Sequence, residues 1–140
     1  LSFQSVLAAS RGRHTLVALT QGQTALGGTL PPSEWTGVGG LFHLSGLPPG
    51  EVVGSYGASG ALLYLCRLGR LPKFGDGIYL GLSLEAGNAW RTAEEASTGD
   101  LRHAWAVVFG ADTLLGPLYL GHGHAEGGSD SFYLYLGRTF

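Results

Sequence analysis

Three potential metal ligands, His122, His124 and Glu126, occur at every second position in the last fifth of the chain. Residues two apart lie on one face of a β-strand, so two imidazoles and a carboxylate spaced in this way could bind Zn²⁺ or Cu²⁺. A fourth ligand is not evident, and the segment leads directly into the polar turn 127–130. We favour the simpler interpretation, in which these side chains meet water at the rim of the fold, and we expect neither a metal nor another cofactor.

A catalytic nucleophile is not evident either. Lipases carry their serine in a Gly-x-Ser-x-Gly elbow between a strand and a helix. The nearest match, Gly-Ala-Ser-Gly at 57–60, has one residue too few after the serine and lies inside a predicted strand. The sequence also lacks phosphate-binding loops and dinucleotide fingerprints. We therefore predict that the chain is not itself an enzyme.

Composition limits the elements that could position these residues. The 140 residues include 25 Gly and 6 Pro, which argues against a mostly helical fold. Only 13% of residues are charged whereas 44% are hydrophobic, a balance too apolar for an ordinary soluble surface. The formal net charge of -2 provides no basic excess for nucleic acid phosphates. We expect one domain, residues 1–140, with part of its surface covered by something other than water and with no nucleic acid partner.

The order of apolar segments and turns is typical of an antiparallel β meander of about seven or eight strands. Between the second and third strands lies a Gly- and Pro-rich stretch, 24–53, which is too long for a hairpin turn and is of a length that is usually functional or disordered. The predicted strands are 2–10, 14–23, 54–68, 77–90, 101–111, 117–125 and 131–140.

The strand 77–90 has one oily face and one small or polar face. These two sets alternate along it: Ile78, Leu80, Leu82, Leu84 and Ala86 against Tyr79, Gly81, Ser83, Glu85 and Gly87. A soluble sandwich would carry many Lys, Glu and Thr on its outer face, whereas here the second face is largely Gly, Ala and Ser. The pattern favours a transmembrane β-barrel with its oily face in lipid. The alternative is a soluble β-barrel that binds a small ligand.

Four motifs occur in order along the chain. They are a Gly39-Gly40 pair with Leu44-Ser45-Gly46-Leu47, the strand end Glu85-Ala86-Gly87-Asn88-Ala89-Trp90, the hairpin Leu115-Gly116-Pro117-Leu118, and the terminal aromatic Phe140. With these motifs the chain resembles the outer-membrane barrel superfamily of bacterial assembly factors and two-partner secretion transporters, and is closest to the barrel of patatin-like phospholipases or to small members without N-terminal domains. The resemblance covers essentially all 140 residues but only the C-terminal half of a barrel of about sixteen strands.

The resemblance implies a location, partners and a function. It implies a bacterial outer-membrane protein in contact with lipid and lipopolysaccharide, with Phe140 as the signal that the outer-membrane assembly machinery recognises. Its relatives insert or export proteins, so protein insertion, translocation or membrane anchoring is the implied role. The stretch 24–53 would be a lid loop folded into the lumen, with Leu41, Phe42, Leu44 and Leu47 as apolar anchors and with Gly46 at positive φ.

One departure from the family pattern has chemical content. The lid-loop arginine of the family reaches acidic residues on the barrel wall, whereas Ser45 stands in its place here. Glu85 matches one of those acids, and Arg67 stands where another would be. We expect either that Arg67 and Glu85 form an ion pair across adjacent strands or that Arg67 lies near the rim and reaches water.

Closure of the barrel is the last expectation. A sheet of about seven or eight strands has two edges, and in lipid those edges must be paired. An eight-stranded barrel leaves no room for a lid loop of this length. We therefore expect two chains to associate as a homodimer around one two-fold axis, sharing a barrel of roughly 14–16 strands.

Overall fold

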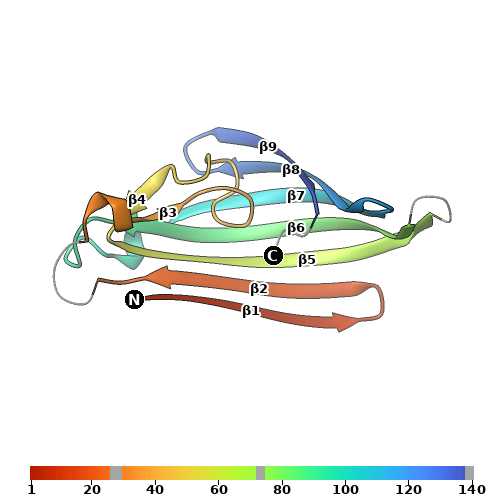
Figure 1. Cartoon of the computed structure of the whole chain (residues 1–140), viewed down its shortest axis with the longest axis horizontal. Coiled ribbons are helices and arrows are strands. Elements are labelled where there is room, and N and C mark those ends of the chain that lie inside the picture. The colour runs from red at the N-terminus through yellow and green to blue at the C-terminus, as the bar shows by residue number, and fades with distance from the viewer. Residues whose placement is uncertain (26–29, 72–74, 138–140) are drawn as a thin grey trace.

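The computed structural model describes residues 1–25, 30–71 and 75–137 (Figure 1). Within these residues the chain consists of antiparallel strands, two short 3₁₀ turns, η1 (Pro32–Glu34) and η2 (Thr98–Asp100), and connecting loops, with no α-helix. The prediction of an all-β fold is confirmed. No helix among the described residues is long and apolar enough to cross a membrane.

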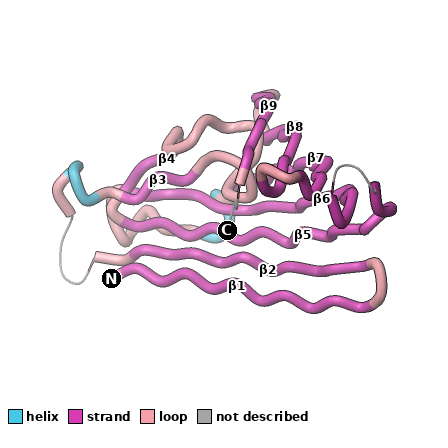
Figure 2. The backbone as a smooth tube through the Cα atoms, turned by 45° about the vertical axis from the view of Figure 1, so that its right-hand side comes forward, coloured by secondary structure: helices cyan, strands magenta, loops and turns pink. Residues whose placement is uncertain are grey.

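Seven strands form one antiparallel sheet in the order β1-β2-β5-β6-β7-β8-β9 (Figures 1 and 2). Each strand pairs with the next along the chain, except that a two-stranded sheet, β3-β4, is inserted between β2 and β5. The bounds are β1 (Ser2–Arg11), β2 (His14–Gln23), β3 (Thr36–Val38), β4 (Val52–Gly54), β5 (Tyr56–Leu71), β6 (Gly75–Trp90), β7 (Arg102–Thr113), β8 (Gly116–Ala125) and β9 (Ser129–Leu136).

The observed strands of the large sheet follow the predicted ranges closely. The main difference lies in 24–53, expected to be a loop throughout, where the three-residue strands β3 and β4 form an antiparallel pair. Such short strands are below the length at which an alternating pattern can be recognised. The predicted strand 131–140 begins two residues earlier and ends at Leu136, while Phe140 lies outside the described residues.

The large sheet has one covered and one uncovered face. On the covered face, called the inner face here, Leu63, Ser83 and Val108 are fully buried, because residues 38–47 pack over them. On the outer face Leu82 and Leu84 retain 47% and 60% of their exposure. The predicted sorting of 77–90 into two faces is therefore observed, with its oily side uncovered by any described part of the chain.

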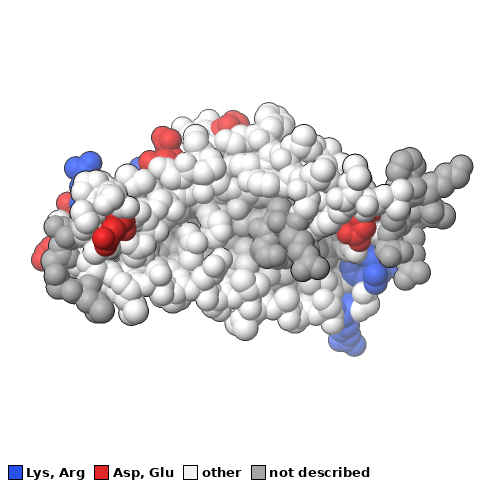
Figure 3. All heavy atoms as spheres, in the orientation of Figure 1, with Lys and Arg blue, Asp and Glu red and all other residues white. Residues whose placement is uncertain are grey.

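Most charged side chains of the strands lie toward the strand ends. Among the strand residues whose side chains are described, these are Arg11, Arg67, Arg102, Asp112 and Asp130. Glu85 alone lies at mid-sheet, and it points inward. On the face seen in Figure 3 most coloured atoms lie toward the two ends of the long axis, and the middle is largely white.

The described sheet does not close. β1 pairs only with β2, and β9 only with β8, so each has an unpaired edge. Seven strands that alternate in direction leave β1 and β9 running the same way. A shared barrel with a two-fold axis along the strands would then join β1 of one copy to β9 of the other in parallel, which removes the advantage that we expected of the homodimer.

Candidate functional site

The candidate site is the contact surface between residues 36–54, called the lid segment here, and the inner face of the sheet. Two of the sequence motifs meet there. Two apolar clusters form this surface. Leu41 and Phe42 pack with inner-face residues of β2, β5 and β7, while Val38, Leu44 and Leu47 pack with Ala104 and Ala125. All five lid-segment residues are buried. Alanine and glycine on β7 and β8 leave the room that these larger side chains fill.

A buried carboxylate lies at the centre of this contact surface. Glu85 on β6 is only 5% exposed, and Ser45, at the tip of the lid segment, is completely buried. The Ser45 backbone N–H donates to Glu85 Oε2 over 2.6 Å, and the Ser45 hydroxyl donates to Oε1 over 2.7 Å. The Ser83 hydroxyl, on the same strand face, also donates to Oε1. Three neutral donors thus satisfy a charge that would otherwise be costly to bury.

The predicted pair between Arg67 and Glu85 is wrong. The register of β5 and β6 places Arg67 opposite Tyr79 and Glu85 opposite Ala61, six positions apart along each strand. That separation amounts to about 20 Å, far beyond the reach of an ion pair. Arg67 instead donates to the Gly12 carbonyl over 3.5 Å, at the end of the sheet where a short turn joins β1 and β2. This position agrees with the other expectation, that Arg67 lies near the rim. Ser45 itself contacts the Glu85 carboxylate.

The residues around Ser45 adopt a tight, strained turn. Phe42 and Leu44 have positive φ angles of 66° and 73°, which cost about 1–2 kcal/mol each for residues with a Cβ. The Ser45 hydroxyl accepts a hydrogen bond from the Phe42 N–H over 3.1 Å. Gly39, Gly40 and Gly46 also have positive φ, which agrees with the prediction for Gly46. Burial of Phe42 and Leu44 offsets the strain.

Strands β8 and β9 hold the other side of the turn. The Gly46 N–H donates to the Tyr133 hydroxyl over 3.1 Å, and the Ser131 hydroxyl donates to the Gly46 carbonyl over 2.9 Å. A Cβ on Gly46 would overlap the backbone of Ala125, and a Cβ on Gly123 would overlap Ser45. Gly46 and Gly123 therefore permit the close approach of turn and sheet.

Several of these residues were missed by sequence reasoning. Ser83, Gly123, Ser131 and Tyr133 all contact the turn or the carboxylate. Ser83 could have been found, since it lies two positions before Glu85 and so shares its strand face. The contribution of Gly123, Ser131 and Tyr133 depends on where the lid segment lies over the sheet, which strand periodicity does not reveal.

His43 is the ionisable lid-segment residue nearest this carboxylate. Its side chain is half-buried, and burial lowers the pKa of the imidazole below its usual value of 6.5, while the negative charge of Glu85 acts in the opposite direction. Because burial outweighs the charge, the folded segment favours the neutral imidazole.

The candidate metal triad is not assembled. His124 Nδ1 and His122 Nε2 lie 2.9 Å and 3.4 Å from Asp130 Oδ1, on the outer face of β8 and β9. Glu126 lies instead 3.2 Å from His103 Nδ1, and this contact lowers the pKa of its carboxyl. Throughout the described ranges, no three His, Cys, Asp or Glu side chains are grouped so that they could hold a metal ion.

Searches against family models, curated proteins and solved structures found no match for this chain.

Gly123→Ala should displace the lid segment, because its new methyl group would occupy the space of the Ser45 side chain. Gly121→Ala is the matched control, since a Cβ there meets its nearest neighbour, a methyl group of Leu41, at an ordinary 3.5 Å. We expect Gly123→Ala to lower the free energy of unfolding by about 1–3 kcal/mol and Gly121→Ala to leave it nearly unchanged. Equal denaturation midpoints for the two variants would show that the close approach is not required.

Acidification should loosen the lid segment. A histidine whose pKa is lower in the folded than in the unfolded state binds fewer protons when folded, so stability is lost as the pH falls through about 6.5. We expect amide hydrogen exchange at 42–47, corrected for intrinsic rates, to be faster at about pH 5.5 than at about pH 8. In His43→Gln this difference should shrink. An unchanged pH dependence in that variant would assign the effect to another group.

Proposed function

We propose that this chain forms part of the wall of a bacterial outer-membrane β-barrel, with residues 36–54 packed in its lumen as a lid. The observation that carries the proposal is the division of the sheet: its outer face is apolar and uncovered, whereas its inner face mixes apolar, small and polar side chains and is occupied by the lid segment. Lipid would cover the outer face at no desolvation cost. Apart from Glu85, which points inward, the described charged side chains of the strands lie toward the strand ends, and this distribution supports the same placement.

The connections support an orientation in that membrane. At one end of the sheet, β1 and β2 are joined by the tight turn 12–13, and β7 and β8 by 114–115. At the other end lie the lid segment and the loop 91–101. Outer-membrane barrels have short periplasmic turns and longer extracellular loops. The lid segment then enters the lumen from the extracellular side.

Closure of this barrel requires partners for β1 and β9. Since both edge strands run in the same direction, an all-antiparallel closure needs an odd number of further strands between them. A homodimer about an axis along the strands would contain two parallel seams, so it is the less favoured closure. Additional strands, from this protein or another, that pair antiparallel with β1 satisfy the geometry better.

The proposed role is protein insertion or translocation, or anchoring of a protein in the membrane, with no catalytic activity in this chain. A lid held by the buried Glu85 carboxylate, by the hydroxyls of Ser131 and Tyr133 and by two apolar clusters closes part of the lumen in the resting state. Transport would require its displacement. The assembly signal proposed for Phe140 belongs to the same account, although that residue lies outside the described part of the chain.

Site-directed labelling in vesicles tests the placement. In a Cys66→Ser background, Leu82→Cys on the outer face and Gln21→Cys on the inner face are labelled with a polarity-sensitive dye. We expect brominated acyl chains to quench the label at position 82 and aqueous iodide to quench the label at position 21, because one faces lipid and the other the lumen. Val107→Cys, also on the outer face and 40% exposed, should behave like Leu82→Cys.

The soluble alternative gives the opposite pattern. A soluble small-ligand-binding β-barrel would remain monodisperse without detergent and would not enter vesicles, and its labels at positions 82 and 107 would be quenched by iodide alone. That result would overturn the membrane proposal.

A further inference from the structure

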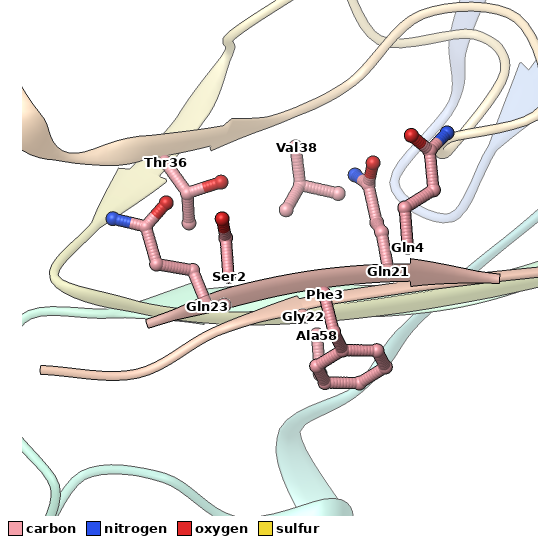
Figure 4. A pocket seen from close by; sticks show the side chains of 10 residues that line it. Ser2, Phe3, Gln4, Gln21, Gly22, Gln23, Thr36, Val38 and Ala58 are labelled. Atoms are coloured by element: carbon pink, nitrogen blue, oxygen red, sulfur yellow. The ribbon is translucent and has the colours of Figure 1, made fainter.

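A polar cleft lies on the inner face of the sheet, beside the lid segment and apart from the contact surface around Glu85. It has a volume of about 220 Å³ and is bounded by β1 and β2 on one side and by β3 on the other. Figure 4 shows the side chains of Ser2, Gln4, Gln21, Gln23 and Thr36 directed into the same space, while the ring of Phe3 points to the opposite side of the strands.

The lining of this cleft is rich in hydrogen-bonding groups and carries no charge. Three carboxamides and two hydroxyls project from three strands, and none of the ten lining residues is ionisable. Gln23 uses its Nε2 to donate to the Glu34 carbonyl over 2.7 Å, which fixes that side chain and leaves its oxygen free to accept. Gln4 and Gln21 have no side-chain hydrogen bond to any described residue.

The remaining lining gives the cleft its shape. Gly22, Gly57 and Ala58 carry no polar side chain, and Val38, at 1% exposure, offers almost no surface to a ligand. The cleft is therefore small, with hydrogen-bond donors and acceptors around it.

We propose that this cleft binds one ring of a neutral saccharide. A sugar hydroxyl donates and accepts, and so does a carboxamide, so that Gln4 and Gln21 can each donate to and accept from ring hydroxyls, while the free Gln23 oxygen can accept from one. A charged ligand would lose its hydration without gaining a counter-charge, which disfavours it.

The volume distinguishes a sugar ring from an extended peptide. Sites that enclose whole drug-sized ligands measure about 300–1,000 Å³. A cleft of about 220 Å³ closed on one side by β3 suits a single ring, whereas a peptide main chain needs a longer groove. This inference does not depend on membrane insertion, because the cleft is formed entirely by described residues of one chain.

Saturation-transfer NMR titrations of the whole chain test the proposal. The protein is kept in lauryldimethylamine oxide, a detergent without a sugar headgroup, and D-glucose, D-galactose and D-mannose are titrated separately. We expect at least one of them to bind saturably with a Kd of about 1–10 mM, as befits a ligand of so few atoms. D-glucuronate and D-glucosamine should bind at least about threefold more weakly than the corresponding neutral sugars.

Variants assign the signal to the cleft. Gln21→Ala and Gln4→Ala should each weaken sugar binding about three- to tenfold through the loss of one or two neutral hydrogen bonds. Ser5→Ala, on the exposed outer face of β1, should leave the Kd unchanged within a factor of about two. Gln4 lies on an exposed edge strand, so its variant keeps the test valid if Gln21→Ala does not fold.

Three outcomes would overturn the assignment. They are no saturable signal with any neutral sugar, equal affinities in the wild type and both glutamine variants, or binding of N-acetyl-triglycine amide without binding of any sugar. The last result would identify the cleft as a peptide site.

Discussion

Burial of the Glu85 carboxylate is the constraint on which the inner face of this protein depends. An ionised acid at mid-sheet is tolerable only if donors surround it, and the Ser45 amide, the Ser45 hydroxyl and the Ser83 hydroxyl provide them. Two of these three donors come from a segment 40 residues away in the sequence. The carboxylate therefore has all three of its hydrogen bonds only when the lid segment packs on the sheet. The same hydrogen bonds hold the segment in a turn with two strained residues.

The rest of the sheet is consistent with that requirement. Gly123 and Gly46 let the turn approach β8, while Ala104 and Ala125 leave room for Leu44 and Leu47. The outer face has no comparable partner in the described chain, and its leucines remain uncovered. The uncovered apolar outer face and the two unpaired edge strands are the features on which the proposal of a barrel wall rests.

Much of the fold was predictable from period-two patterning and turn residues, which depend on local sequence alone. The strand ranges and the sorting of 77–90 into two faces follow from these signals. Contacts between side chains on different strands were harder to predict, because they depend on the strand register. Arg67 and Glu85 lie six positions apart along the paired strands, and Glu126 contacts His103 rather than joining His122 and His124. The role of Ser45 as the residue that contacts Glu85 could not be seen from a motif in which arginine is expected.

The measurement that most directly tests the central claim is a double-mutant cycle between Ser45→Ala and Glu85→Gln. Stability of the lid segment would be measured by hydrogen exchange of the amides at 42–47 in the wild type, the two single variants and the double variant. The account predicts a coupling free energy of about 1–3 kcal/mol, because the two residues share charge-assisted hydrogen bonds. Additivity within about 0.5 kcal/mol would contradict it, since the Ser45 hydroxyl would then not stabilise the lid segment through Glu85.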